Sequence, residues 1–325
     1  MPVRRDHQLL VDAARMYYIE GLDQGQVGRR LGLSRSSVSH ILAAARETGV
    51  VQVRIAGDEH VPRNRDLEHA LVRTFGLREA LVAETSAAAT ELRAVGLLGA
   101  QVFTRRAPGA TRIGFSWGMT VGQVIEAIPQ MTLRPDCRLT PLVGGMPTVD
   151  SGPSGNANIR ILADKCGLNA ERFDAPAIVE SANTCRALLS ESSVRSALTR
   201  ARSCDLAFVG IGSFGVQTSR RVLEAMNLSE SELARMTAAE PVGDMLGRFF
   251  DITGAELGPP SQDRVVGIEL TDLADIEVVV GLAAGKAKAT GVLGALRTGA
   301  IDLLVVDEGL AAALLANATN QIRSH

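Results

Sequence analysis

The sequence predicts an α/β protein in two parts: a small N-terminal winged helix-turn-helix domain, and a larger domain with a mostly parallel β-sheet covered by helices on both faces. Three observations support this fold class. Apolar residues recur at helical spacing through the first 48 residues, where a glycine separates two short helices. From about residue 67 onward, apolar runs alternate with long stretches rich in alanine and leucine, as in doubly covered parallel sheets. Only 3% of the residues are aromatic against 46% apolar, which predicts an aliphatic core.

The chain is long enough for two domains, because 325 residues exceed the size of one small module. GDEHVPRNRD, residues 57–66, is polar and contains a proline, so we place a linker there. The N-terminal domain, here called the head, then covers residues 1–56, and the second domain covers residues 67–325.

Three helices are predicted in the head. The first lies over residues 5–20, where apolar side chains recur at helical spacing: Leu9, Leu10, Ala13, Met16 and Tyr17. Two more lie within residues 24–48, joined by a turn at Gly32, and Ser34 is a natural N-cap of the third. One buried side of this pair is formed by Val27, Leu31, Leu33, Val38, Ile41 and Leu42. VVQVRI, residues 50–55, alternates like a short strand and predicts the wing.

The polar and basic side chains of this helix pair are left facing outward, as in a helix that enters a DNA major groove. We expect the arginines to contact phosphates and the serines and histidine to approach base edges. The predicted DNA-binding residues are Arg29, Arg30, Ser34, Arg35, Ser36, Ser37, Ser39 and His40. The charge distribution agrees: residues 1–56 hold eight arginines against five acids, a net of +3, so the other 269 residues sum to −5 within the total of −2.

Several classes of protein are not favoured by the composition. No apolar run reaches the length of a membrane span, and the start lacks a signal-peptide core, so we expect a soluble cytoplasmic protein. The four cysteines (137, 166, 185 and 204) have no CxxC spacing, which favours buried small side chains over a metal or redox site. No histidine lies between residues 70 and 324, which argues against imidazole acid–base catalysis in the second domain. We therefore expect no metal, no cofactor and no enzyme activity.

The second domain is predicted to alternate strands and helices. The expected strands are 79–84, 111–116, 138–144, 177–179, 205–212, 264–270, 276–283 and 301–307. The expected helices are 86–106, 118–128, 156–166, 182–202, 219–238, 286–298 and 308–318. Ligands of such sheets bind beyond the carboxyl ends of the strands, so residues that follow the strands are the candidates for a binding site.

The first candidate follows the strand at 111–116 and comprises Ser116, Trp117, Gly118, Met119 and Thr120. Backbone N–H groups at the start of the next helix, with the two hydroxyls, would suit a phosphate. The alternative is an ordinary strand–helix turn with a serine cap. Gly144 and Gly145 follow another strand, where they could open space beside a ligand or only turn the chain.

The glycines of VGIGSFG, residues 209–215, have the spacing of a dinucleotide fingerprint. That fingerprint needs an acid at the end of a second strand about 20 residues on, and this stretch has a helical pattern instead, so NAD binding is not favoured. Gly212 remains a candidate for close backbone approach to another ligand.

Two more candidates carry charged groups. Asp244 and Arg248 stand among apolar residues and glycines, where they could bind sugar hydroxyls and a phosphate, or only pair with each other. Lys286 follows Gly285 at a strand end and could meet a sugar oxygen or a phosphate, whereas Lys288 is expected to be a solvated helix residue.

Taken together, these motifs resemble the SorC family of bacterial transcriptional regulators, within the DeoR/SorC sugar-sensing group. The resemblance covers nearly the whole chain: LGLSRSSVSHILAAARETGVVQVRI, then GFSWGMT, LVGG, CDLAFVGIGS, PVGDMLGRFFD and GK…GALRTG…IDLLVVDE, in that order. It implies a second domain similar to the sugar-phosphate isomerase and CoA-transferase superfamily. It also implies a homotetramer and an effector that is a phosphorylated sugar or polyol.

By this resemblance, residues 116–120 would hold the effector phosphate, with Gly144, Gly212, Asp244 and Lys286 around the sugar. Some positions depart from the family pattern. Gly25 and Gly28 stand in the second helix, where the family more often has Glu and Ala. His40 stands where an arginine is common, and Met119 replaces a polar residue of the phosphate loop.

The expected function is a transcriptional regulator of a carbohydrate catabolic operon, whose binding to double-stranded operator DNA is controlled by such an effector. One alternative is a sugar-phosphate isomerase with an appended DNA-binding head, in which Asp244, Asp251, Asp307 or Glu308 would act as the base. Another is a binding module in which residues 1–56 serve only in oligomerisation.

Overall fold

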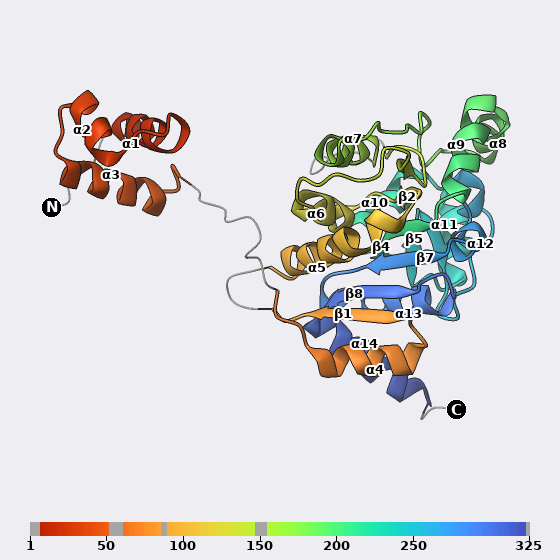
Figure 1. The fold of residues 1–325 in the computed structure, drawn as a ribbon. Coiled ribbons are helices and arrows are strands. Elements are labelled where there is room, and N and C mark those ends of the chain that lie inside the picture. Colours follow the sequence, from red (N-terminus) through yellow and green to blue (C-terminus); the bar gives the residue numbers. More distant parts are fainter. Residues whose placement is uncertain (1–6, 52–60, 86–89, 147–154, 323–325) are drawn as a thin grey trace. The chain divides into compact units, whose positions relative to one another are not determined.

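A computed structural model describes residues 7–51, 61–85, 90–146 and 155–322 (Figure 1). The chain divides into two compact units between His60 and Val61. The second unit thus begins within the predicted linker, 57–66. Val61 is buried, and Arg63 forms an antiparallel bridge with Ala83, so residues 61–66 pack in this unit rather than linking two domains.

The described part of the head contains three helices: α1 (His7–Ala14), which continues as the π-helical turn η1 (Arg15–Ile19), α2 (Gln24–Leu31) and α3 (Arg35–Glu47). Its core is formed by Leu10, Ala13, Val27, Val38, Ile41, Leu42 and Ala45. Leu31 and Leu33 are only partly buried against this core. The predicted wing at 50–55 lies outside the described residues from position 52 onward, and Val50 and Val51 pack against the head core.

The turn between α2 and α3 explains a glycine that departs from the family pattern. Gly32 ends α2 with a φ of 66°, and the Ser34 hydroxyl accepts a hydrogen bond from the Ser37 N–H at 3.1 Å, as predicted for an N-cap. The Leu33 N–H donates to the Gly28 carbonyl at 2.8 Å, and a Cβ on Gly28 would lie 2.6 Å from the Leu33 carbonyl oxygen. A side chain at position 28 would therefore push the two helices apart.

The second unit is built on a sheet whose six main strands are all parallel (Figure 1). In spatial order they are β1 (Glu79–Ala83), β8 (Leu303–Asp307), β7 (Val278–Leu282), β4 (Leu206–Ser213), β2 (Arg112–Phe115) and β3 (Arg138–Pro141). The predicted mostly parallel sheet is confirmed.

Helices cover both faces of this sheet. Successive residues of a strand therefore pack into two different apolar cores, one on each face. In β4, Leu206 and Phe208 belong to one apolar core, and Ala207 and Val209 belong to the other. The first core is closed by α5 (Glu91–Arg106), α6 (Met119–Ala127) and α7 (Gly155–Cys166). The second is closed by α4 (Arg65–Phe75), α8 (Ala182–Ser190), α9 (Ser192–Arg202), α10 (Gln217–Ala225), α11 (Glu230–Ala238), α12 (Leu270–Ala274), α13 (Ala289–Arg297) and α14 (Glu308–Ile322).

Two long predicted helices are each divided in the structure. The stretch 182–202 breaks at Glu191, whose ψ of 135° is extended. The stretch 219–238 breaks at Asn227, which has a φ of 47°, and Ser229 then opens α11 with a capping box. The predicted helix at 286–298 begins with the 3₁₀ turn η4 (Lys286–Lys288).

Two predicted strands, 177–179 and 264–270, form only isolated bridges, such as Ile178 with Val265. The sequence also missed an antiparallel hairpin of β5 (Gly243–Met245) and β6 (Arg248–Phe250), which pairs with the end of β4. Strands of three residues are too short to leave a periodic pattern. This hairpin closes one side of the site described next.

Two further features bear on the expected class of protein. No helix among the described residues is long and apolar enough to cross a membrane. All four cysteines are buried, as expected, and burial raises the pKa of the Cys204 thiol to about 12.

Candidate functional site

A pocket lies at the carboxyl ends of β2 and β4, where the chain connections diverge. The chain leaves β2 through α6 on one face of the sheet and leaves β4 through α10 on the other face. Such switch points are where open α/β sheets bind ligands. The pocket has about 440 Å³ of space not occupied by protein atoms, part of which is open solvent. It is lined by Trp117, Gly118, Met119, Thr120, Gly210, Ile211, Gly212, Val216, Thr218, Ser219, Asp244, Leu246 and Lys288.

Two helices begin at this pocket without a side-chain cap. Gly118 precedes α6 with a φ of 126°, and Val216 precedes α10. Neither of these two residues supplies a side-chain cap. Residues before and within both first turns line the pocket, including Thr120 and Thr218. Uncapped N–H groups and the positive ends of two helix dipoles favour an anion between them.

Asp244 brings a carboxylate to the same space from the hairpin that the sequence missed. It lies opposite Gly212 in the β4–β5 register and is only 5% exposed. The Ser219 hydroxyl lies near this carboxylate, but neither Asp244 Oδ1 nor Ser219 Oγ has a partner in good hydrogen-bond geometry among the described residues. Burial raises the pKa of Asp244 to about 6, while the Ser219 hydroxyl, the Lys288 charge and the Gly247 N–H oppose the rise. Unpaired polar atoms at a buried position are costly, so a ligand that completed their hydrogen bonds would be favoured.

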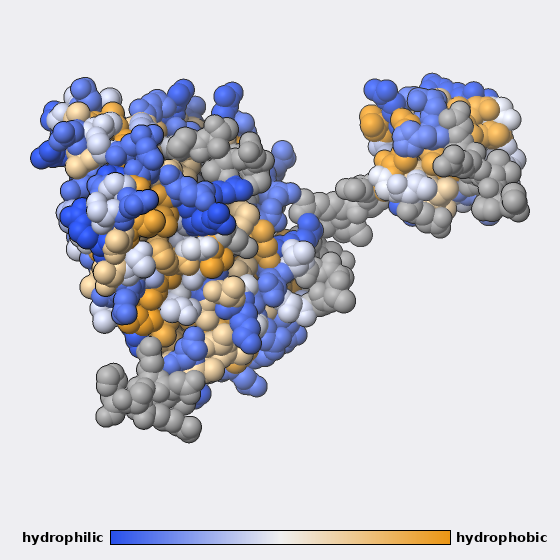
Figure 2. All heavy atoms as spheres, turned by 180° about the vertical axis from the view of Figure 1, so that it is seen from behind, coloured by the Kyte–Doolittle hydropathy of each residue, from blue (hydrophilic) through white to orange (hydrophobic). Residues whose placement is uncertain are grey.

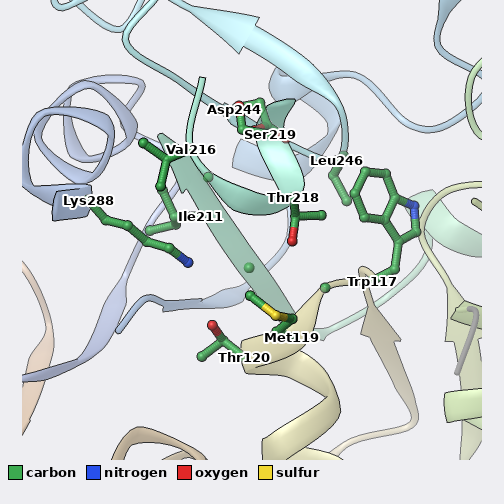
Figure 3. A pocket seen from close by; sticks show the side chains of 13 residues that line it. Trp117, Met119, Thr120, Ile211, Val216, Thr218, Ser219, Asp244, Leu246 and Lys288 are labelled. Carbon is green, nitrogen blue, oxygen red and sulfur yellow. The ribbon is translucent and has the colours of Figure 1, made fainter. Parts of the chain in front are cut away.

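The lysine of the pocket is Lys288, and the expectation that it is a solvated helix residue is wrong. Lys286 is exposed and does not line the pocket, whereas Lys288 is half-buried. Figure 3 shows the Lys288 ammonium and the hydroxyls of Thr120 and Thr218 turned toward one central space. Burial lowers the pKa of Lys288, and the charges of Asp244 and Asp307 raise it. The 3₁₀ turn after Gly285 accounts for the error, because the sequence predicts an α-helix there.

The remaining wall of the pocket is apolar, formed by Trp117, Met119, Ile211, Val216 and Leu246 (Figure 3). The Trp117 indole is 8% exposed, and its Nε1 atom has no partner among the described residues. It is the only tryptophan of the chain. A pocket lined by both charged and apolar residues fits an amphipathic small molecule.

Ser116 does not line the pocket, although it was predicted to bind the effector. Its hydroxyl accepts from the Gly210 N–H at 3.0 Å and donates to the Trp117 carbonyl at 3.3 Å. The side chain is 2% exposed and joins the ends of β2 and β4. Its contacts therefore fix the loop that carries Trp117.

Arg248, Gly144 and Gly145 were also predicted for the site and do not line it. Arg248 is buried and donates to the Ile268 carbonyl at 2.7 Å and to the Glu256 carboxylate at 2.9 Å, so it is tied into the protein instead of facing a ligand. The Gly144 N–H donates to the Val266 carbonyl, and the Gly145 N–H donates to the Ala175 carbonyl. Both glycines are therefore bonded to other loops and not to the pocket.

Sequence reasoning missed Gly210, Ile211, Val216, Thr218, Ser219 and Leu246 as lining residues. A signal was present for the second helix start, because VGIGSFG ends a strand directly before it. The predicted residues that do line the pocket are Trp117, Gly118, Met119, Thr120, Gly212 and Asp244.

In the head, most predicted DNA-binding side chains are exposed, namely Arg29, Arg30, Arg35, Ser36, Ser39 and His40. Ser37 is half-buried, and Arg30 forms an ion pair with Glu20 at 2.6 Å. The Ser34 hydroxyl is engaged in capping α3 and contacts the hydroxyls of Ser36 and Ser37 at 2.9 Å each.

Comparison with known proteins identifies the family. Residues 59–316 match the family described as "Putative sugar-binding domain". The chain is 30% identical over 320 residues to the sorbitol operon regulator of Klebsiella pneumoniae, covering 95% of this chain and 98% of that protein. It is also 30% identical over 312 residues to the transcriptional regulator LsrR of an Enterobacter species, covering 96% and 94%.

The crystal structure of the full-length sorbitol operon regulator SorC from Klebsiella pneumoniae has the same fold, with a TM-score of 0.70 and 29% identity over 95% of this chain and 98% of that one. These relatives are named as transcriptional regulators and not as enzymes, which supports the regulator over the isomerase alternative. The chain therefore belongs to the SorC/DeoR-like family of sugar-binding transcriptional regulators.

Proposed function

We propose that this regulator binds operator DNA through its head and that a phosphorylated sugar or polyol in the pocket controls that binding. The observation that carries the proposal is the convergence of two uncapped helix starts and one lysine, Lys288, on a pocket that also holds a buried carboxylate. A phosphate fits the cationic end of such a pocket, and hydroxyl groups fit the carboxylate.

The phosphate would lie between the first turns of α6 and α10, against Lys288. Two helix termini and one ammonium together supply donors for three phosphate oxygens. Thr120 and Thr218 line the same space and can donate through their hydroxyls. An uncharged sugar would leave these groups unpaired, so a phosphorylated ligand is expected to bind more tightly than its unphosphorylated counterpart.

The sugar or polyol chain would extend toward Asp244. Its Oδ1 atom and the Ser219 hydroxyl have no partner in good hydrogen-bond geometry among the described residues, and both can bond to ligand hydroxyls. The carbon-bound hydrogens of the ligand would face the apolar wall that includes Trp117 and Leu246. Polar atoms for hydroxyl groups beside apolar side chains for carbon-bound hydrogens favour a polyhydroxylated chain over a purely anionic ligand.

DNA binding is proposed for the exposed side chains of α2 and α3. Arg35, Ser36, Ser39 and His40 lie in the N-terminal half of α3, the part of a recognition helix that contacts base edges. Arg29 would contact the DNA backbone. The surplus of positive charge in residues 1–56 agrees with a phosphate-facing head.

We further propose a homotetramer that acts in the cytoplasm, as the family resemblance implies. Figure 2 shows apolar side chains gathered between polar ones on one face of the second unit, and patches of this kind are common at subunit interfaces. Size-exclusion chromatography with light scattering measures the assembly directly, and a monomer at micromolar concentration would contradict the tetramer.

A fluorescence titration tests the ligand. Trp117 lines the pocket and is the only tryptophan, so its emission reports occupancy directly. Matched pairs such as D-sorbitol with D-sorbitol 6-phosphate, and D-fructose with D-fructose 6-phosphate, are compared. We expect saturable changes with at least one phosphorylated compound and an affinity for its unphosphorylated partner that is at least about tenfold weaker. Equal affinities within every pair would remove the phosphate from the proposal.

A further inference from the structure

The carboxyl edge of the sheet connects the pocket to the start of the second unit. Residues 61–64, here called the entering segment, follow the head in the chain, and Arg63 pairs with Ala83 at the end of β1. Ala83 in turn pairs with Asp307 at the end of β8. These pairings place the entering segment and Asp307 in one row across the sheet.

Asp307 binds the turn that carries the pocket lysine. It is fully buried, and its Oδ2 atom accepts from the Gly285 N–H at 2.6 Å, immediately before the turn Lys286–Lys288. The Gly285 carbonyl accepts from the Lys288 N–H at 3.0 Å. The Asp307 Oδ1 atom accepts from the Leu310 N–H at 3.0 Å, in the first turn of α14. One carboxylate therefore holds both the pocket turn and the start of α14.

The next residue, Glu308, holds the entering segment. Its Oε1 atom accepts from the Asn64 Nδ2 group at 2.8 Å. Asn64 is also the N-cap of α4, because its Oδ1 atom accepts from the Leu67 N–H at 3.1 Å, and its own N–H donates to the Val82 carbonyl at 3.0 Å. A movement of Glu308 therefore acts on the cap of α4 and on the last residue of the entering segment.

The entering segment is fixed by a second polar contact. The Glu68 carboxylate of α4 is buried and accepts two hydrogen bonds from Arg63, at 2.6 and 2.9 Å. It also accepts from the Val82 N–H at 3.0 Å. The segment is thus attached to the sheet edge through directional polar contacts, which weaken steeply when their geometry changes.

We propose that Asp307 and Glu308 are positioning residues that couple the pocket to the entering segment: Asp307 holds the turn of Lys288, and Glu308 holds Asn64. In the regulator this coupling would carry the effect of the ligand toward the head, and to that extent it rests on the proposed function of the pocket. A ligand that draws the Lys288 ammonium toward itself shifts the turn that Asp307 holds. By linkage, the coupling is reciprocal: loss of the Asn64 contact must change the free energy of ligand binding in the pocket by the same amount that ligand binding changes the free energy of that contact.

The coupling is tested without ligand or DNA, by a double-mutant cycle on the full-length protein. The variants are Lys288→Met, Glu308→Ala and the pair, and the readout is hydrogen–deuterium exchange of the peptide that covers residues 61–68. We expect Lys288→Met to change the exchange rate of this peptide by about threefold or more in the wild-type background. The change should fall to within about 1.5-fold when Glu308→Ala is present. An unchanged rate in Lys288→Met, or the same factor in both backgrounds, would overturn the coupling.

Matched variants separate this result from general loss of structure. Lys286→Met changes an exposed lysine two residues away and should leave the exchange of residues 61–68 as in the wild type. Glu308→Gln retains an acceptor oxygen for Asn64 and should preserve the effect of Lys288→Met. If Glu308→Ala does not fold, Asn64→Ser removes the same side-chain bond and keeps a good helix cap. The titration of Trp117 with sugar phosphates fails or succeeds independently of this cycle, so each idea is tested by itself.

Discussion

Gly212 and Asp244 lie opposite each other between β4 and β5, so close that a Cβ on Gly212 would come within 2.1 Å of Asp244 Oδ1. The glycine is therefore what allows a buried carboxylate to reach the pocket from the hairpin. Two weak sequence signals, a glycine near the end of β4 and an acid in a distant motif, therefore belong to one site.

Gly212→Ala is expected to displace Asp244 and to weaken ligand binding by at least about tenfold, with a loss of roughly 1–3 kcal/mol in unfolding free energy from overpacking. Urea denaturation and Trp117 fluorescence titration measure the two effects. Gly145→Ala is the matched control, since a Cβ there meets nothing within 4 Å and the residue does not line the pocket. Equal behaviour of the two variants would show that Asp244 does not depend on the glycine.

Asp244→Asn is expected to stabilise the protein at neutral pH while weakening ligand binding. The pKa of Asp244 is raised from 3.8 to about 6, so the folded state binds the proton more tightly than the unfolded state does. The contribution of this group to stability is thus largest below about pH 4 and is lost as the pH rises to about 6. The loss is on the order of 1–3 kcal/mol.

The measurement is the difference in urea stability between wild type and Asp244→Asn at about pH 4 and about pH 7. We expect the variant to gain relative stability at the higher pH. A difference that is independent of pH, or that changes in the opposite direction, would show that burial does not control this carboxyl.

Arg248→Met is expected to destabilise the fold by roughly 3–5 kcal/mol, because it leaves the buried acceptors around it and Glu256 without their partner. Arg220→Met is the comparison, since Arg220 forms an exposed pair with Glu224 and should cost less than about 1 kcal/mol. Chemical denaturation decides between this structural role and the ligand-binding role that the sequence predicted for Arg248. Normal stability together with lost ligand binding would favour the latter.

Gly28→Ala is expected to abolish DNA binding while the second unit keeps its ligand response. The added Cβ would lie 2.6 Å from the Leu33 carbonyl oxygen, a backbone atom that cannot move without separating α2 from α3. Gly25→Ala is milder, because the nearest atom is the Asp23 side-chain oxygen at 3.1 Å. Fluorescence anisotropy with labelled duplex DNA compares the two. Full DNA affinity in Gly28→Ala would contradict the close packing of the turn.

Much of the fold could be predicted because buried parallel strands leave continuous apolar runs, as at β4, β7 and β8. The divided helices were missed because apolar residues continue across Glu191 and Asn227, although the Ser229–Glu232 capping box was a readable signal for the second break. The β5–β6 hairpin is too short for any period, and its position depends on pairing with the end of β4.

The site was predictable where a glycine lies at or just after the end of a strand, as at Gly212 and Gly118. It was not predictable where a local turn decides which side chain points inward. The 3₁₀ turn after Gly285 brings Lys288 to the pocket and leaves Lys286 exposed, although both lysines follow the same strand. Arg248 illustrates the opposite error: it was predicted to bind a ligand but is bonded within the protein. Its backbone-carbonyl partners are far away in the sequence and could not be foreseen.

The most direct test of ligand-controlled DNA binding is an anisotropy titration on a duplex that the protein itself selects from a random pool. The measurement is made with and without a sugar phosphate that changes Trp117 fluorescence. We predict that the ligand alters DNA affinity by about 5- to 150-fold in the wild type and in Lys286→Met, and has no effect in Lys288→Met. Arg35→Ala should lose DNA affinity and keep the fluorescence response. A bound ligand that leaves the DNA affinity of the wild type unchanged would contradict the account.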